Sequence, residues 1–556
     1  MITSKKKVIH LIHQILKLNL VFFIITLINS FIPAQTSVQI PHLEIQTSGS
    51  TQLIVHGQPF LMIGGELGNS NASDLKFMEW IWPKLDTIGL NTVLVPVYWE
   101  LLEPEEGEFD FSLLDGIIKK AREYDMHLVL LWFGSWKNSM SCYVPQWVKT
   151  DQKRFPRAVN EQGRGMEMLS AFSVNNRKAD ARVFTELMKH LKQIDGKDNT
   201  VVMIQVENEI GMIPQARDRS KQADDEFSKP VATELISYLQ KNKNKLIPAF
   251  YDLWGENGFK TTGTWQDVFG VGPVAEEIFS AWCYARYVND IAEQGKAEYP
   301  LPMYVNAALI RPNYKPGQYP SGGPLPHLMD VWRAGAPAID FLSPDIYFPT
   351  FAEWCRRYHQ SGNPLFIPEV ALDENTAANA FYAFSQHEAM GFCPFSIEYL
   401  ADPQNAKLSK VYYLLRQMST FILASQGKDK MRGALLDEVN QRDTLEIGEY
   451  RFNIAHDYTF AWAKHAEGPW PRVGGMIISV APDEFFIAGS GIIVTFETNP
   501  PGKATVGIAS IDEGKFVDGK WIAGRRLNGD QSHQGRHLRI ATTDIGIQRI
   551  KLYTYK

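Results

Sequence analysis

The sequence predicts a (β/α)₈ TIM barrel followed by a C-terminal all-β sandwich. Apolar, strand-like runs alternate with helical patterns eight times, which is typical of βα units around a parallel sheet. Two of these runs end in glutamates, where barrel enzymes carry their sites. Beyond about residue 427 the helical periodicity stops and short alternating strands recur between turn residues, as in a sandwich. We therefore assign the barrel to residues 37–425 and the sandwich to residues 427–556.

The N-terminus has the pattern of a signal peptide. Three lysines at positions 5–7 precede an apolar run over residues 20–28, and the small residues Ser30 and Ala34 follow it. The run is short for a membrane span, so an uncleaved anchor is the alternative that we favour less. We predict that residues 1–34 are removed on export, that the mature protein is periplasmic or extracellular, and that it keeps no stable membrane span.

After a short β-rich entry, eight strands account for the barrel. Residues 246–254 are apolar enough for a strand, but their spacing fits the end of a helix better, so the fifth strand is placed after a long insertion. The predicted strands are 60–65, 92–98, 127–133, 201–206, 303–307, 339–347, 365–367 and 393–397. The predicted helices are 75–88, 113–123, 177–194, 274–293 and 410–422.

The sandwich is predicted from alternation and turn chemistry. Residues 499–502 (Asn-Pro-Pro-Gly) are one of several turn signals between its strands. The predicted strands are 444–451, 458–462, 475–480, 484–488, 491–497, 504–512, 538–542 and 549–555.

Composition excludes several classes of function. The net charge is −6, and the chain has neither a basic stripe nor a phosphate-binding glycine loop, so we expect no nucleic-acid partner. The four cysteines, Cys142, Cys283, Cys355 and Cys393, match no metal-binding spacing and define no disulfide pairing. There is also no His/Asp ligand cluster, so we predict neither a metal nor a cofactor. The sequence makes no prediction of oligomeric state.

Two glutamates at strand ends are the candidate catalytic pair. The run 201–206 leads into Glu207-Asn208-Glu209, and the run 365–367 leads into Pro368-Glu369. Two carboxylates facing one cavity are the groups that glycoside hydrolysis requires, whereas an isolated glutamate is more often part of a structural ion pair. We predict that Glu209 and Glu369 are catalytic. Glu207 lies two residues before Glu209 and would share its face on a continuing strand, so we interpret it as a supporting group.

Several segments together resemble glycoside hydrolase family 35, the β-galactosidases, within the barrel clan shared with family 42. Residues 205–211 (Gln-Val-Glu-Asn-Glu-Ile-Gly) resemble the family's acid/base strand, and residues 64–67 (Gly-Gly-Glu-Leu) resemble its opening strand. Residues 99–104 (Trp-Glu-Leu-Leu-Glu-Pro) and the Gly-Glu-Phe-Asp-Phe after them resemble the signature that follows the second strand. The likeness spans residues 40–425, and the sandwich resembles the C-terminal domain of a bacterial subgroup.

The resemblance implies a role for each matching residue. Glu209 corresponds to the acid/base and Glu369 to the nucleophile of a retaining mechanism. Asn208 corresponds to the asparagine that bonds the 2-hydroxyl of the sugar, and Tyr347 to a tyrosine that orients the nucleophile. Two segments depart from the family pattern: Glu100 replaces an asparagine, and residues 134–138 replace an Ala-Glu pair that contacts galactose. The exact sugar and linkage therefore stay open.

Further substrate-binding candidates come from their positions near strand ends. Glu66 and Glu103 would either bind sugar hydroxyls or pair with an arginine. Trp99 and Trp136 would either stack on a sugar or pack at the barrel rim. Asn306, in the fifth strand, is a weaker candidate for binding a hydroxyl.

The prediction is an exported, retaining exo-β-galactosidase that removes terminal galactose from oligo- or polysaccharides without a cofactor. Its only expected partner is the carbohydrate substrate, a galactose-bearing glycan. One alternative is a related exo-glycosidase with the same catalytic pair, namely a β-glucosaminidase or an arabinopyranosidase. An alternative of another class is a non-catalytic glycan-binding protein, although such a protein would have no need of both Glu209 and Glu369.

Overall fold

The computed structural model describes residues 39–463, 468–517 and 519–556. The predicted signal peptide, residues 1–34, lies outside the described residues. In the described part of the chain, no helix combines the length and the apolarity that crossing a membrane requires.

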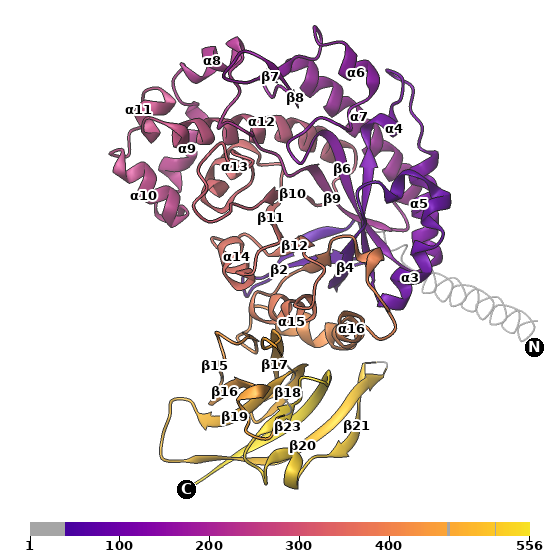
Figure 1. The fold of residues 1–556 in the computed structure, drawn as a ribbon, viewed down its shortest axis with the longest axis vertical. Helices are drawn as coiled ribbons and strands as arrows, with labels where there is room; N and C mark the ends of the chain where they lie inside the picture. Colours follow the sequence, from indigo (N-terminus) through magenta and orange to yellow (C-terminus); the bar gives the residue numbers. More distant parts are fainter. Residues whose placement is uncertain (1–38, 464–467, 518) are drawn as a thin grey trace, which may run out of the picture. The chain divides into compact units, whose positions relative to one another are not determined.

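Eight parallel strands close into a barrel, which confirms the predicted fold (Figure 1). The fifth strand is the one chosen from the sequence, and most of the apolar run 246–254 lies in helix α10 (Pro248–Glu256), as its spacing indicated. The barrel strands in order are β4 (Met62–Glu66), β5 (Thr92–Tyr98), β6 (His127–Lys137), β9 (Val201–Asn208), β10 (Met303–Ala308), β11 (Phe341–Ile346), β12 (Phe366–Val370) and β13 (Gly391–Pro394).

Helices cover the outside of the barrel. The run predicted as one helix over 75–88 is broken into α2 (Leu75–Met78) and α3 (Ile81–Ile88). The other predicted helices are longer than predicted by up to five residues at an end, because their end turns extend beyond the apolar periodicity. They are α5 (Ser112–Glu123), α7 (Val174–Asp195), α12 (Pro273–Glu298) and α16 (Lys407–Ser425). Helix α15 (Thr376–Gln386) was not predicted. The insertion before β10 also contains α8 (Lys221–Phe227), α9 (Thr233–Lys241) and α11 (Trp265–Phe269).

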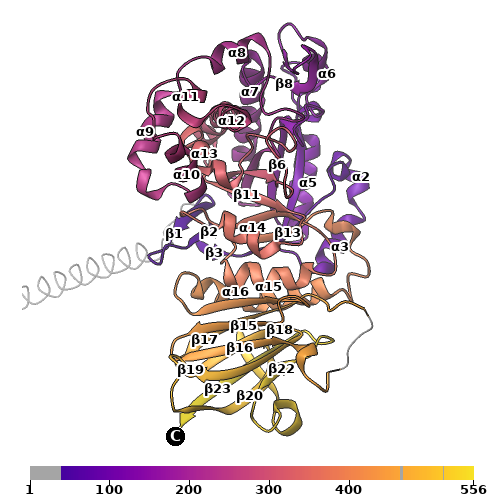
Figure 2. The same ribbon diagram turned by 60° about the vertical axis from the view of Figure 1, so that its left-hand side comes forward.

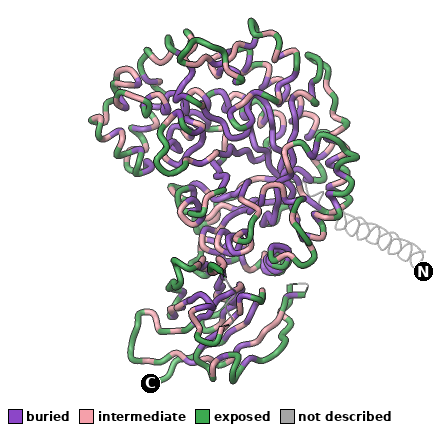
Figure 3. The backbone as a smooth tube through the Cα atoms, in the orientation of Figure 1, coloured by how far each residue is buried: buried purple, intermediate pink, exposed green. Residues whose placement is uncertain are grey.

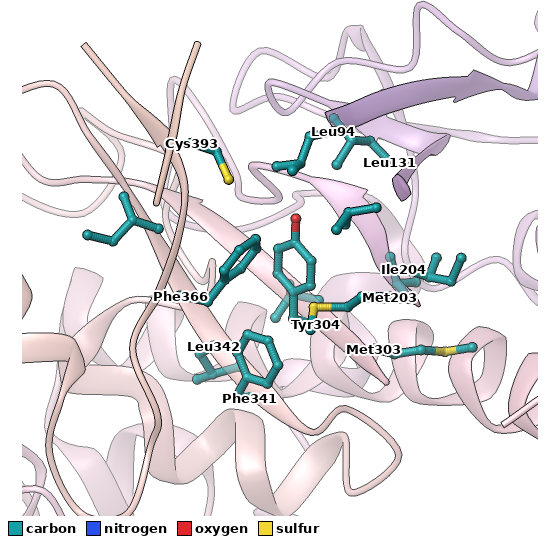
Figure 4. Packing of buried hydrophobic residues seen from close by; sticks show 14 of the residues in the cluster. Leu94, Leu131, Met203, Ile204, Met303, Tyr304, Phe341, Leu342, Phe366 and Cys393 are labelled. Atoms are coloured by element: carbon teal, nitrogen blue, oxygen red, sulfur yellow. The ribbon is translucent and has the colours of Figure 1, made fainter. Parts of the chain in front are cut away.

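The barrel strands are buried except at one end residue each of β6 and β10, whereas the outer faces of the helices are exposed (Figure 3). Inside the barrel, Tyr304 stacks on Phe341 at 5.4 Å between ring centroids and meets Phe366 edge-on at 5.1 Å (Figure 4). Met203 joins this layer from β9. Because this apolar layer fills the interior, polar chemistry is confined to the carboxyl ends of the strands.

The segment before the barrel and the domain after it are antiparallel. Strands β1 (His42–Ile45), β2 (Thr51–Val55) and β3 (Gln58–Phe60) form the predicted β-rich entry. The C-terminal domain has a six-stranded and a four-stranded sheet around an apolar core of its own, which confirms a sandwich. The six-stranded sheet contains β14 (Met431–Leu436), β17 (Val473–Ala481), β18 (Glu484–Ser490), β23 (Gly546–Tyr555), β20 (Thr505–Val517) and β21 (Lys520–Arg526). The four-stranded sheet contains β15 (Arg442–Ile447), β16 (Tyr450–His456), β19 (Ile492–Thr498) and β22 (Leu538–Ile540).

Three details of the sandwich differ from the sequence prediction. The predicted strand 444–451 spans the β15–β16 hairpin, which turns at Gly448 with a φ of +57°. The predicted strand 458–462 is wrong, because the 3₁₀ turn Asp457–Thr459 lies there. Strands β14 and β21 were not predicted; β21 has polar side chains on both faces and therefore lacks the alternation that marks a half-buried strand.

The outer face of the six-stranded sheet packs on α15 and α16 of the barrel (Figure 2). The approach is close at Gly474, where a Cβ would lie 2.6 Å from the carbonyl oxygen of Ala378. Met476, Ile478 and Phe486 on this face belong to the same apolar cluster as the barrel. Packing against the barrel is therefore one function of the sandwich. All four cysteines are free thiols.

Candidate active site

Glu209 and Glu369 face each other at the carboxyl end of the barrel, just after β9 and within β12. Together with Asp345 of β11, each offers one carboxylate oxygen, and these oxygens all lie within 4.8 Å of one another. Glu209 is 7% exposed and Glu369 is 4% exposed. The structure thus brings together the two glutamates that the sequence paired across 160 residues and adds a third carboxyl group.

A local break in strand geometry directs Glu209 to this position. Glu207 has a φ of +61° and Glu209 a φ of +43°, both in the left-handed region that residues other than glycine rarely adopt. Such conformations concentrate at functional sites, where surrounding contacts hold them. As a result Glu207 does not share the face of Glu209. It turns outward and accepts hydrogen bonds from the backbone N–H groups of Ser135 and Trp136, at 3.1 Å and 2.6 Å.

Glu207 is a supporting group, as predicted, but it does not lie on the face of the strand that the prediction gave it. Burial, and then the neighbouring Asp180, raise the pKa of the Glu207 carboxyl well above its ordinary value. Asp180 also accepts hydrogen bonds from the Oγ of Ser135 and the indole N–H of Trp132. The two carboxyl groups therefore fix the end of β6, which carries Lys137 into the cavity.

Both carboxylate oxygens of Glu369 are engaged. The hydroxyl of Tyr347 donates to Oε2 at 2.6 Å, and the amide of Asn208 donates to Oε1 at 3.3 Å. Both donors stabilise the charged form and fix its orientation. Tyr347 is 44% exposed, so its ring borders the opening of the cavity.

Glu209 is held as a carboxyl group that can be protonated near neutral pH. Burial and then the charge of Glu369 raise the pKa of Glu209 to about 7, while the ammonium group of Lys137 partly offsets them. The amide of Asn138 donates to Oε2 of Glu209. The backbone N–H of Glu209 donates to Oδ1 of Asn306 at 3.0 Å, so Asn306 positions this residue from β10.

Lys137 is the cation of the cavity, and it lies in the segment that departs from the family pattern. Its ammonium group donates to Oδ1 of Asn208 at 2.9 Å, and the residue is 5% exposed. Burial opposes the charged form, but Glu369, Glu209 and other carboxyl groups outweigh burial and raise the pKa of Lys137. From the sequence, Lys137 and Asn138 were the residues expected to distinguish the substrate of this chain, without an assigned role in the catalytic pair.

Asp345 was not among the predicted site residues, although strand alternation could have identified it. It lies in β11, two residues before Tyr347, and therefore on the same face of the predicted strand. Its Oδ2 accepts from the amide of Asn306 at 2.7 Å, and its carboxyl group forms a hydrogen bond with that of Glu209. Burial, and then Glu369 and Glu209, raise the pKa of Asp345 well above its ordinary value.

Glu66, at the end of β4, has carboxyl oxygens that can accept hydrogen bonds from a ligand in the cavity. It is fully buried, and neither of its carboxyl oxygens has a hydrogen-bond partner among the described residues. Burial and then Glu369 raise its pKa well above the ordinary value. A buried polar group without a partner is costly, so Glu66 is well placed to bond a hydroxyl group of a ligand.

Three of the residues predicted to contact the substrate lie outside the cavity, and the prediction is corrected for them. Glu103 is fully buried and accepts from the indole N–H of Trp99 and the backbone N–H of Gly107, and it pairs with Arg182. Trp99 and Trp136 are also fully buried, so neither ring has a face for a sugar. The alternative interpretations therefore apply: Glu103 forms an ion pair, and the two tryptophans pack at the barrel rim. The ion pair joins residues 79 positions apart, a separation that sequence spacing does not reveal.

Among the described residues, the trio Glu209, Asp345 and Glu369 is an arrangement that could hold a metal ion. Carboxylate oxygens suit hard divalent cations. Lys137 already supplies a positive charge to the same cavity, within reach of these carboxyl groups.

Comparisons with known proteins found β-galactosidases. Residues 75–295 match the family model Glyco_hydro_42, described as β-galactosidase, and residues 408–539 match DUF5597, a domain of unknown function. The chain is 24% identical over 178 residues to β-galactosidase 13 of Arabidopsis thaliana, covering 31% of this chain and 19% of that one. It is 29% identical over 83 residues to a β-galactosidase of Xanthomonas manihotis, covering 14% of each chain. The chain therefore spans less than a fifth of the length of these curated relatives.

Solved structures of β-galactosidases are also similar. That of Bacillus circulans sp. alkalophilus has a TM-score of 0.45 at 14% identity, covering 65% of this chain and 57% of that one. That of Marinomonas ef1 has a TM-score of 0.44 at 15% identity, covering 66% and 60%. The matching family model is that of family 42, and family 35 in particular stays a prediction. Residues 75–295, within the barrel, are therefore similar to the family-42 β-galactosidases.

Proposed function

We propose that this protein is a retaining exo-β-galactosidase in which Glu369 is the nucleophile and Glu209 the acid/base. The observation that carries the proposal is the pairing of two differently held carboxyl groups, with oxygens within 4.8 Å of each other. Retaining enzymes place their carboxyl groups about 5–5.5 Å apart, whereas inverting enzymes leave roughly 6.5–9.5 Å for a water molecule. The short separation therefore supports direct attack on the sugar.

In the first step, a carboxylate oxygen of Glu369 attacks the anomeric carbon while Glu209 gives its proton to the departing glycosidic oxygen. The bond to the leaving group breaks, and a glycosyl ester forms on Glu369. In the second step, Glu209 takes a proton from a water molecule, whose oxygen attacks the anomeric carbon and releases the sugar. Both carboxyl groups return to their starting states, and no cofactor takes part.

The surrounding groups suit this division of roles. Tyr347 and Asn208 stabilise charge on Glu369, whereas burial next to Glu369 keeps a proton on Glu209 up to about neutral pH. Lys137 bonds the carbonyl oxygen of Asn208, and this orients the amide N–H₂ of Asn208 toward Glu369 and toward the expected place of the 2-hydroxyl group. We further propose that Glu66 accepts a hydrogen bond from another sugar hydroxyl.

We also propose that the chain is exported and acts on galactose-bearing glycans outside the cytoplasm. The support is the N-terminal pattern of lysines, apolar run and small residues.

One observation favours a second candidate, a β-glucosaminidase. The ammonium group of Lys137 interacts with the carboxyl groups of Glu66, Glu209, Asp345 and Glu369, and the raised pKa values of Glu66, Glu209 and Asp345 show that one cation does not satisfy them all. A sugar that carries an ammonium group would supply a second cation and stabilise the ionised form of a carboxyl group there.

The test is a panel of nitrophenyl β- and α-glycosides, offered to the purified chain and to the variants Glu209→Gln and Glu369→Gln. The control variant is Glu106→Gln, which removes an exposed rim carboxylate that pairs with Arg154. The proposal expects cleavage of the β-galactoside, loss in both catalytic-pair variants and none in the control. Faster cleavage of the β-glucosaminide would favour the second candidate. A folded chain that binds galactose-terminated glycans without cleaving any would favour a binding protein.

A further inference from the structure

Three aromatic side chains form an exposed strip on the barrel rim. Phe77, Trp80 and Tyr399 are 43%, 44% and 58% exposed, respectively. The ring of Trp80 lies between the other two, with centroid distances of 5.9 Å to Phe77 and 6.2 Å to Tyr399. Single exposed aromatics are common, but three in contact form a continuous apolar surface that indicates a binding site.

The strip lies at the end of the barrel that carries the catalytic pair. Phe77 and Trp80 belong to the segment after β4, and Tyr399 belongs to the segment after β13. These two strands are neighbours in the closed barrel. Loops that follow barrel strands surround the active site, so the strip borders the cavity between its first and last strands.

Glu398 connects the strip to the cavity. It directly precedes Tyr399 and is fully buried. Its Oε1 accepts from the backbone N–H of Gly68, at 3.0 Å, and from the amide of Asn71, whereas its Oε2 has no partner among the described residues. Its negative charge is also one of the influences that raise the pKa of Glu66. Glu398 therefore links the segment after β13, which carries Tyr399, to the segment after β4.

We propose that Phe77, Trp80 and Tyr399 form a subsite for the part of the glycan that lies beyond the sugar being released. The C–H face of a pyranose ring is apolar and packs on an aromatic ring, while its hydroxyl groups need hydrogen-bond partners at the edge. The strip offers the rings, and the ammonium group of Lys84, 5.9 Å from the centre of the Trp80 ring, can donate a hydrogen bond to a hydroxyl group at its edge. This inference rests on the proposed function, which requires the remaining glycan to leave the cavity over the rim.

The place of the strip in the barrel decides its occupant. A glycan whose terminal sugar lies between Glu209 and Glu369 must leave the site at the carboxyl end of the barrel, where the segments after β4 and β13 carry the three rings. We therefore assign the strip to a glycan.

The test compares the wild type with Trp80→Ala and Tyr399→Ala, and with Tyr555→Ala as a control for loss of an exposed aromatic ring in the sandwich. Binding is measured by retardation of the native protein in gels that contain arabinogalactan, a polysaccharide with terminal β-galactose. Hydrolysis of nitrophenyl β-galactoside, which has no extended glycan, is measured in parallel. The variants Trp80→Phe and Tyr399→Phe keep a ring and should restore binding.

We expect arabinogalactan to retard the wild type and the control, and each alanine variant to bind about tenfold more weakly, which corresponds to ~1.4 kcal/mol. Hydrolysis of the aryl galactoside should stay within about twofold of the wild type, because the rings lie outside the cavity. No retardation of the wild type, or equal retardation of the alanine variants, would overturn the subsite. Inactivity on every aryl glycoside would instead count against the proposed function, while the gels would still decide on the subsite. Dimerisation that is lost in Trp80→Ala, without any effect on glycan binding, would assign the strip to a second copy.

Discussion

Lys137 donates a hydrogen bond of 2.9 Å to Oδ1 of Asn208, and Asn208 donates one of 3.3 Å to the nucleophile candidate Glu369. The two bonds link β6, β9 and β12 across the carboxyl end of the barrel. Because an ammonium group can only donate, this link fixes which end of the Asn208 amide faces Glu369. The ammonium group of Lys137 thus holds the amide of Asn208 in hydrogen-bonding contact with Glu369.

The pH dependence of activity should reflect the protonation of Glu209. The general acid works only while it carries its proton, and the pKa of Glu209 is raised to about 7 by burial and by Glu369. We therefore expect kcat/KM for an aryl β-galactoside to fall as the pH rises through about 7. Glu209→Gln should abolish this limb, and its residual rate should be highest on aryl leaving groups that need no proton. A basic limb that persists in this variant would contradict the assignment.

Asp345→Ala should shift the same limb to higher pH. Burial and the neighbouring carboxyl groups raise the pKa of Asp345 well above its ordinary value, and the hydrogen bond between Asp345 and Glu209 lowers the pKa of Glu209; alanine removes that hydrogen bond. We expect an upward shift of about one pH unit in the kcat/KM profile. The control is Ser343→Ala, which changes a buried side chain two residues earlier in β11. An unchanged limb, or a shift to lower pH, would contradict this influence of Asp345 on Glu209.

Tyr347→Phe should slow catalysis without loss of folding. The hydroxyl group of Tyr347 donates to Glu369 at 2.6 Å, while its ring borders the opening and would keep its packing. Loss of one such donor costs on the order of tenfold to a hundredfold in kcat, with a smaller change in KM. Tyr399→Phe removes a hydroxyl group from the rim and should leave activity on aryl glycosides unchanged. Equal rates for wild type and Tyr347→Phe would remove the proposed role.

Glu66→Gln should make the protein more resistant to high pH. The folded state keeps a proton on Glu66, because burial and then Glu369 raise its pKa, whereas the unfolded chain releases that proton above about pH 4.3. Stability of the wild type therefore falls as the pH rises, by at most about 1.4 kcal/mol per pH unit for this group. Glutamine resembles the protonated form, so the Tm advantage of the variant should grow between about pH 5 and about pH 8. A constant difference in Tm would contradict the raised pKa.

Much of the fold was predictable because barrel strands are strongly apolar and are separated by clear helical patterns. The run 201–206 and the choice of residues 303–307 are examples, since β-branched and apolar residues fill both faces of these strands. The polar strand β21 was missed because alternation, the signal used for the sandwich, is absent there.

The site was predictable where chemistry lies at the end of a strand, as for Glu209 and Glu369. It was less predictable where long-range packing decides the role of a side chain. Trp99 and Trp136 have the composition of sugar-binding residues, but the fold buries them. Glu207 departs from the expected face because its backbone and that of Glu209 adopt positive φ values, which strand periodicity does not reveal.

The central claim is that Glu369 forms a covalent bond to the sugar. A 2-deoxy-2-fluoro-β-galactosyl fluoride slows both steps and should accumulate the ester, which mass spectrometry of proteolytic fragments can locate. We predict one added fluorogalactosyl group on the fragment that contains Glu369, no label in Glu369→Gln, and recovery of activity as the ester hydrolyses. A label on another carboxyl group, or hydrolysis of the aryl galactoside with inversion at the anomeric carbon, would contradict the proposed mechanism.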